Sequence, residues 1–344
     1  MPSHFAHLLF AEEALIASLG EKGQDILASH GNLVRFGAQG PDFFYHNQRT
    51  MPTGLRYGTA LHRHGYGAFL EGLVREALRL SAGPSSELGA YILGFATHAP
   101  LDRVCHPFIG YFAGWADPGP DSIKRRYHTH PFMERILDVL LLQQRFGKSP
   151  AELDFLSLVR CGKTLPYTVV KAFVKSLNAT YPSYNFKSRD RLRVQNAYHD
   201  AVFFYTVTNH LNPELIKMAF KKDRKDGFRE RRLGLLHPRE VPTGYDFLNT
   251  SHAPWCHPCT EEPVFTTSFL DLYEQALTRC LPMLKDLHAV LSGHAPIEGL
   301  GERLGNESLD TGREQCTPVH SHPLPLVEIL ESIYGRLDRE LSGG

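Results

Sequence analysis

Two short stretches of this sequence repeat a histidine or an acid at every fourth residue. In chain order they are His98, Asp102 and His106, followed by His130, Glu134 and Asp138. Residues four apart lie on one face of an α-helix, so each stretch can direct three polar groups to the same side. Neutral imidazoles and ionised carboxylates are ligands of zinc, at distances of about 2.0–2.2 Å. The spacing therefore predicts that these stretches contribute ligands to a metal site.

A simpler explanation exists for any single pair of this kind. A histidine and an acid four apart also occur on helix surfaces, where such a pair contributes only about 0.2–0.5 kcal/mol. Both stretches, however, lie in strongly apolar segments, in which a charged group without a partner is costly. Two such stretches in succession therefore favour a metal site over two surface pairs.

Helices must position these groups, and the apolar pattern predicts helices along most of the chain. Apolar residues recur at three- and four-residue steps, and no run of alternating residues marks a strand. The segments expected to be helical are 8–16, 69–80, 87–105, 132–145, 150–178, 190–211, 212–222, 266–292 and 326–341. The predicted fold class is therefore all-α.

Prolines and turn residues predict where the helices are interrupted. Pro107 predicts a helix end at His106, and Pro131 predicts a helix start. Ser268 and Asp271 resemble a capping box at the start of a helix. The stretch 30–60, rich in Gly, Pro, Asn and aromatic residues, is expected to be a long ordered loop.

The same features predict the domain organisation. Residues 1–292 are expected to form one helical domain, and 293–325, rich in Gly, Pro and His, a flexible connection. Residues 326–344 are expected to form a C-terminal helix.

Composition limits the classes of function. Hydrophobic residues make up 42% of the chain, and Lys+Arg 37 balances Asp+Glu 37, so no bulk attraction to nucleic acid or membrane is expected. The first apolar stretch lacks a basic start and is broken by Glu12 and Glu13, and no run reaches the length of a membrane helix. The six cysteines are scattered, which favours reduced thiols. The expected location is the cytoplasm.

Several motifs occur together in a fixed order over residues 1–140. They are MPSHFAHLLFAEE, GAQGPDFFY, YILGFATHAPLDRVCHP and HPFMERILD. As an ordered set they resemble the zinc-dependent phospholipase C family, which is itself similar to the fungal single-strand zinc nucleases. The resemblance implies an all-α, multi-helix bundle of the phospholipase C / zinc nuclease type.

The resemblance also implies three sets of zinc ligands. They are Asp42, His62, His98 and Asp102 for one ion, His106, His130 and Glu134 for a second, and His7 with the bridging Asp102 for a third. His64 and His128 are rivals for the places of His62 and His130, but the motif alignment and the four-residue step to Glu134 favour the latter pair. In secreted relatives an N-terminal Trp completes the third site. This chain has no such Trp, so two or three zinc ions are expected.

The implied activity is hydrolysis of a phosphodiester by in-line attack of zinc-bound hydroxide. Asp42 is expected to be both a ligand and the general base. In lipid-cleaving relatives an aromatic residue just after this Asp helps to line a pocket for a cationic headgroup, so the resemblance implies this role for Phe43. Packing of the loop onto the helices is the preferred alternative role for this ring. The expected substrate is a phospholipid headgroup, with transient contact to a membrane surface and no stable nucleic-acid complex.

Two other functions stay open from the sequence alone. One is a single-strand nuclease on the same metal scaffold, and the other is a non-catalytic binding protein stabilised by metal. Outside residues 1–140, His252, Cys256, His257 and Cys259 suggest either a zinc knuckle or, preferably, a structural turn with Trp255 buried. Residues 221–232 carry seven basic and three acidic groups, which suggests an anionic partner or, preferably, a solvated helix end.

Overall fold

The computed structural model describes residues 4–116, 122–184, 189–208 and 213–342, without the side chains of 122–128 and 342. His128 therefore lies outside the side chains that are described. The α-helices are α1 (His4–Leu19), α2 (Glu21–Ala38), α3 (Leu55–Arg63), α4 (Tyr66–Arg79), α5 (Glu87–Phe112), α6 (Ser122–Phe146), α7 (Phe155–Val159), α8 (Tyr167–Thr180), α9 (Asp190–Thr208), α10 (Pro213–Lys225), α11 (Phe269–Leu291), α12 (Leu300–Leu304) and α13 (Leu326–Ser342). The predicted all-α fold class is confirmed.

Short elements complete the described part of the chain. They are the 3₁₀ turns η1 (Gly40–Phe44), η2 (Pro150–Glu152), η3 (Pro182–Tyr184) and η4 (Arg232–Leu235), and the strands β1 (Trp255–Cys256) and β2 (Val264–Phe265). The two strands form one small antiparallel hairpin, in which Trp255 pairs with Phe265. None of the described helices is both long and apolar enough to cross a bilayer.

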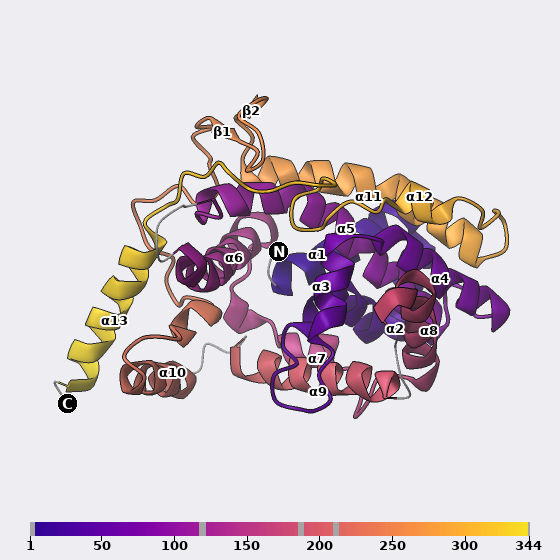
Figure 1. Cartoon of the computed structure of the whole chain (residues 1–344), viewed down its shortest axis with the longest axis horizontal. Helices are drawn as coiled ribbons and strands as arrows, with labels where there is room; N and C mark the ends of the chain where they lie inside the picture. The colour runs from indigo at the N-terminus through magenta and orange to yellow at the C-terminus, as the bar shows by residue number, and fades with distance from the viewer. Residues whose placement is uncertain (1–3, 117–121, 185–188, 209–212, 343–344) are drawn as a thin grey trace.

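Helix α5 lies at the centre of the bundle, and α1, α2, α4, α6 and α11 pack against it (Figure 1). Nearly all of its side chains are buried, as expected for a helix that is apolar on every side. Helix α11 runs along α5 and α1, and its start is closed by the predicted capping box. The Ser268 hydroxyl accepts from the Asp271 amide at 3.1 Å, and Asp271 accepts from the Ser268 amide at 2.8 Å.

The helix boundaries near the prolines differ from those predicted. α5 continues through Pro107 to Phe112, and α6 begins at Ser122, so Pro131 is internal. A proline removes one backbone hydrogen bond, but packing of a helix on several sides outweighs this loss. The long loop predicted over 30–60 is also wrong in part, because α2 extends to Ala38 and α3 starts at Leu55.

The segment between α11 and α13 lies against the bundle. α12 packs on α4, and α13 packs on α6 at one side of the molecule (Figure 1). The chain between α12 and α13 passes back toward α5. Gly312, for example, lies so close that a Cβ there would be 2.5 Å from the Arg103 carbonyl oxygen.

Candidate metal centre

All eight predicted ligands meet in one region at the centre of the bundle. They are His7 on α1, Asp42 on η1, His62 on α3, His98, Asp102 and His106 on α5, and His130 and Glu134 on α6. All are buried except His130, which is half-buried. Their ligand atoms form three groups, within each of which the atoms lie within 4.8 Å of one another. The groups are His7–Asp42–His98, His62–His98–Asp102 and His106–His130–Glu134.

Asp102 is a fully buried carboxylate that faces the imidazole nitrogens of two histidines. Its exposed fraction is 0%, and among the described residues neither of its oxygens has a partner in a regular hydrogen bond. Nε2 of His7 lies 3.3 Å from Oδ1, and Nε2 of His98 lies 3.0 Å from Oδ2. Burial opposes ionisation of Asp102, but the neighbouring His98 and His7 hold its pKa well below the ordinary value. An ionised, buried carboxylate requires positive charge beside it.

His98 is oriented by the backbone at the end of α2. Its Nδ1–H donates to the Ala38 carbonyl at 3.0 Å, because a carbonyl can only accept. Gly40 follows with φ +54°, and a Cβ there would lie 2.2 Å from Cγ of His98. Glycine therefore lets η1 pass over the imidazole ring, and the ring presents the lone pair of Nε2 to Asp102.

His62 has the same arrangement on the other side of the group. Its Nδ1–H donates to the Gly58 carbonyl at 2.7 Å, and its Nε2 lies 2.9 Å from Oδ1 of Asp42. Burial favours the neutral ring, but the hydrogen bond and the charge of Asp42 raise the pKa of His62 to about 9. The surroundings of His62 therefore stabilise added positive charge, whether a proton or a metal ion.

The remaining group joins α5 to α6. His106 Nδ1–H donates to the Asp310 carbonyl at 2.6 Å, and His106 Nε2 lies 3.0 Å from Nε2 of His130. The same nitrogen of His130 lies 2.7 Å from Oε1 of Glu134. Burial keeps the pKa of His106 well below its ordinary value, so its ring is neutral. Neutral imidazole is the form that binds metal.

This set of donors fits zinc. Carbonyl groups fix the tautomers of His62, His98 and His106, which leaves each Nε2 with a lone pair directed at the other ligands. Lone pairs that face a carboxylate at 2.9–3.7 Å repel it unless a cation lies between them. Tetrahedral ligands about 2.0–2.1 Å from zinc are about 3.3 Å apart, which falls within this range.

Asp138 continues the four-residue step of α6 but has another role. Its carboxylate accepts from the amides of Phe5 and Ala6, at 3.2 and 2.9 Å, and lies 2.9 Å from Nε2 of His237. It therefore fastens the first turn of α1 to α6, one residue before His7. His237 was not singled out from the sequence, because no local spacing connects it to α6.

The aromatic residues after Asp42 divide between the core and the site. Phe43 is fully buried, with ring centroids 5.4 Å from Phe36 and 4.0 Å from Phe44, so its place is in the core and not on a pocket wall. The tight turn of η1 directs it inward. Among these residues, Tyr45 lies at the metal centre, 4.9 Å from the ring of His62.

His64, the rival of His62, ends α3 with an exposed side chain. Its ring lies 5.5 Å from the ring of Tyr181, and it belongs to none of the three groups. The geometry therefore favours His62 over His64 as the ligand.

The hairpin that follows residue 252 forms a turn, as preferred from the sequence, and Trp255 is only 3% exposed. His257, Cys259 and Cys316 lie close enough to form a fourth group, but Cys259 and Cys316 are joined in a disulfide with their Cα atoms 5.8 Å apart. Because metals bind thiolates, the disulfide removes two of these ligands. The prediction that all six cysteines are reduced is therefore wrong for this pair, which lies 57 residues apart in the sequence and meets only in the fold.

The basic run 221–232 contains the end of α10, and most of its side chains are exposed, as expected for the solvated helix end that the sequence favoured. Arg224 pairs with Asp338 at 2.9 Å, and Arg231 pairs with Glu331 at 3.2 Å. These ion pairs occupy part of the basic charge and give the run a structural role.

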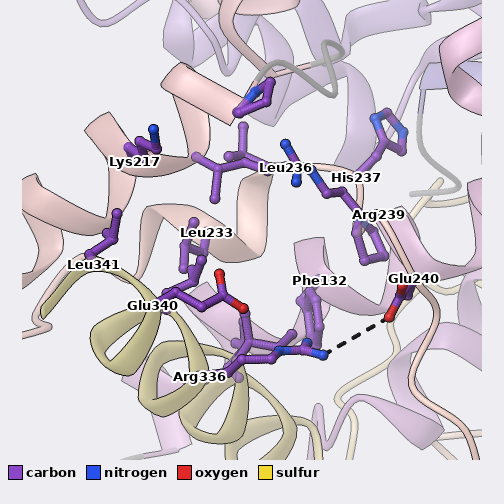
Figure 2. A pocket seen from close by; sticks show the side chains of 16 residues that line it. Phe132, Lys217, Leu233, Leu236, His237, Arg239, Glu240, Arg336, Glu340 and Leu341 are labelled. Atoms are coloured by element: carbon purple, nitrogen blue, oxygen red, sulfur yellow. Dashed lines mark ion pairs between the residues drawn. The ribbon is translucent and has the colours of Figure 1, made fainter. Parts of the chain in front are cut away.

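A cavity of about 260 Å³ lies between α6, α10 and α13 (Figure 2). Phe132, Leu233 and Leu236 contribute to its apolar lining, and Arg336 pairs with Glu240 at 4.0 Å at its edge. None of the metal-centre residues lines this cavity.

Comparison with known proteins agrees with the geometry. The sequence model for zinc-dependent phospholipase C matches residues 6–188, more than half of the chain and the part that contains all eight predicted ligands. Searches of curated proteins and of solved structures returned no match. The chain is thus a member of the zinc-dependent phospholipase C family, with an all-α fold and a histidine and carboxylate centre suited to zinc.

Proposed function

We propose that this protein hydrolyses a phosphodiester of a phospholipid, in the manner of a phospholipase C, with zinc held by the eight residues of the centre. The observation that supports the proposal is Asp102, a fully buried carboxylate between Nε2 of His7 and Nε2 of His98, within ligand groups whose atoms lie within 4.8 Å of one another. Membership of a zinc-dependent hydrolase family supports the reaction class. The phospholipid substrate follows from the name of that family.

Zinc held by these residues would lower the pKa of coordinated water and neutralise charge that develops on phosphoryl oxygens. The chain's own groups prepare the site for this chemistry. Ala38, Gly58 and Asp310 carbonyls hold three imidazoles in one tautomer, and Asp102 joins the His7 and His98 sides. Asp42 and Glu134, which are 5% and 8% exposed against 0% for Asp102, are the carboxylates that incoming water can reach, and we assign acceptance of its proton to Asp42.

A single-strand nuclease is the second candidate, favoured by one observation. Trp115 is half-buried beside the second group, with its ring 4.9 Å from His106 and 5.7 Å from His130. An aromatic face beside the metal can stack a nucleobase, although it can equally attract a cationic headgroup.

The test combines metal analysis with two substrates. We expect purified protein to contain two or three zinc ions, and to release the phosphorylated headgroup from phosphatidylcholine vesicles. Chelation should abolish this activity and added zinc should restore it. Cleavage of single-stranded DNA in preference to the vesicles would identify a nuclease. Undiminished activity after complete removal of metal would refute the proposal.

A further inference from the structure

Residues 305–312, called the strap below, lie against the metal centre although they are more than a hundred positions beyond the family match at 6–188. The Leu309 amide donates to the His62 carbonyl at 2.8 Å, and His106 Nδ1–H donates to the Asp310 carbonyl at 2.6 Å. The Leu309 side chain is fully buried. One short segment thus touches a ligand from each of two metal groups.

The strap is fastened at both ends. At its start, Arg103 donates to the carbonyls of Leu304 and Gly305 at 2.8 and 2.9 Å. At its end, His257 Nε2–H donates to the Thr311 carbonyl at 2.9 Å. Arg103 follows Asp102 directly in α5, so the strap and the buried carboxylate are held by the same turn of the helix.

Gly312 allows the strap to lie this close to α5. Its φ is +65°, and a Cβ there would lie 2.5 Å from the carbonyl oxygen of Arg103. The carbonyl oxygen of Arg103 is part of the α5 backbone and cannot rotate away as a side chain could. A side chain at position 312 would therefore displace the strap. Displacement would pull the Asp310 carbonyl away from His106.

We propose that the strap is a positioning element of the metal centre, in which the Asp310 carbonyl fixes the tautomer and direction of His106 toward the ion shared with His130 and Glu134. The inference rests on the proposed zinc ligation. A hydrogen-bond acceptor on the remote nitrogen of a metal-binding imidazole orients the ring and increases its basicity. His106 receives this acceptor from outside the residues that the family match covers.

The charge of Asp310 is consistent with this position. After burial, Asp310 is the largest influence that raises the pKa of Tyr45, and it adds to the effect of Asp42 in raising the pKa of His62. The Asp310 carboxylate therefore acts on the Asp42 side of the centre, while its carbonyl contacts His106.

The first experiment compares Gly312→Ala with the control Gly293→Ala. Both glycines have a left-handed backbone, with φ +65° and +72°, but a Cβ at Gly293 would meet no atom of the described residues within 4 Å. We expect Gly312→Ala to weaken binding of one zinc ion by about 10–100-fold, the usual effect of losing such a partner. Competition with a chromophoric chelator measures each affinity, and the visible spectrum of the cobalt-substituted protein reports the ligand geometry. Gly293→Ala should match the wild type in both measurements.

A second pair of variants keeps the test decisive if Gly312→Ala does not fold. His257→Ala removes the donor to Thr311, whereas His257→Gln keeps a donor near the position of Nε2. We expect the alanine variant to bind one zinc ion more weakly and the glutamine variant to recover wild-type affinity and cobalt spectrum. Equal zinc affinity in folded Gly312→Ala, or in His257→Ala, would overturn the role of the strap. Absence of tightly bound zinc from the wild type would instead overturn the proposed function.

Discussion

At the scale of single residues, the centre depends on buried carboxylates that face imidazole nitrogens. Asp102 lies between Nε2 of His7 and Nε2 of His98, and His62, which contacts Asp42, has a pKa raised to about 9. Both observations indicate a region that is short of positive charge when no metal is bound. Two effects can therefore be measured separately. One is the loss of zinc binding when a carboxylate is removed, and the other is the stability of the metal-free protein.

Asp102→Asn should abolish binding of the ions that Asp102 contacts. Loss of a hydrogen-bond partner of a ligand costs about 10–100-fold in affinity, so loss of a bridging ligand should exceed that range. Zinc analysis and the vesicle assay should fall together. Asp200→Asn is the matched control, because Asp200 is 1% exposed but accepts from Asn47 and from the Arg49 and Thr50 amides. Full zinc content in Asp102→Asn would contradict the bridging role.

The raised pKa of His62 predicts how the stability of the metal-free protein depends on pH. The folded pKa of about 9 exceeds the ordinary value of 6.5, so the stabilisation is complete below about pH 6.5 and is lost as pH rises through 9. The size is on the order of a few kcal/mol. Urea unfolding from pH 6 to pH 10 measures it, and His62→Gln should flatten the profile. A metal-free wild type that becomes more stable over this interval would contradict the assignment.

At the scale of elements, the ligands are aligned because the helices are attached to one another near the site. Asp138 joins α6 to the first turn of α1, and the carbonyl of Ala38 at the end of α2 orients His98 on α5. These contacts are remote in sequence. They decide whether His7, Asp42 and His98 meet.

Asp138→Ala should loosen α1 and weaken zinc binding at the His7 side. It leaves the Phe5 and Ala6 amides without their acceptor, at a cost of about 1–3 kcal/mol for such buried groups. Denaturation and zinc titration should both respond. Asp271→Ala is the control, since it removes the capping box of α11, which should cost about 0.5–2 kcal/mol without an effect on zinc. Unchanged zinc affinity in Asp138→Ala would show that the contact between Asp138 and α1 does not support zinc binding.

At the scale of the whole molecule, segments C-terminal to the family match pack against the metal centre. The disulfide Cys259–Cys316 connects the hairpin to the end of the chain that carries the strap. The predicted ligands and the groups that contact them therefore extend from α1 to the strap. The proposed division into 1–292, 293–325 and 326–344 stays a prediction.

The disulfide predicts a thiol count that distinguishes it from six free cysteines. Alkylation of the unfolded protein before reduction should modify Cys105, Cys161, Cys256 and Cys280, and reduction should expose Cys259 and Cys316. In the chain-entropy treatment, closing a loop of this length contributes about 4 kcal/mol to stability. Thermal unfolding with and without a reductant measures this contribution, with Cys259→Ser as the comparison. Modification of all six cysteines before reduction would contradict the pairing.

The sequence by itself determined the all-α fold class, the family and the set of candidate ligands. The four-residue steps of α5 and α6 specify a helix face, because helical periodicity is a local property. The sequence also favoured a structural turn at residues 252–259 with Trp255 buried. Local patterns did not predict that α5 continues through Pro107, because packing on all sides outweighs a single proline.

Only the tertiary structure decided which candidates meet and what holds them. Asp138 accepts a hydrogen bond from the first turn of α1, Phe43 is buried in the core, and Cys259 forms a disulfide with Cys316. The carbonyl that orients His106 comes from residue 310, within a stretch whose composition suggested only a flexible connection. Such contacts depend on where helices cross and chains return, and no spacing within a single segment encodes that arrangement.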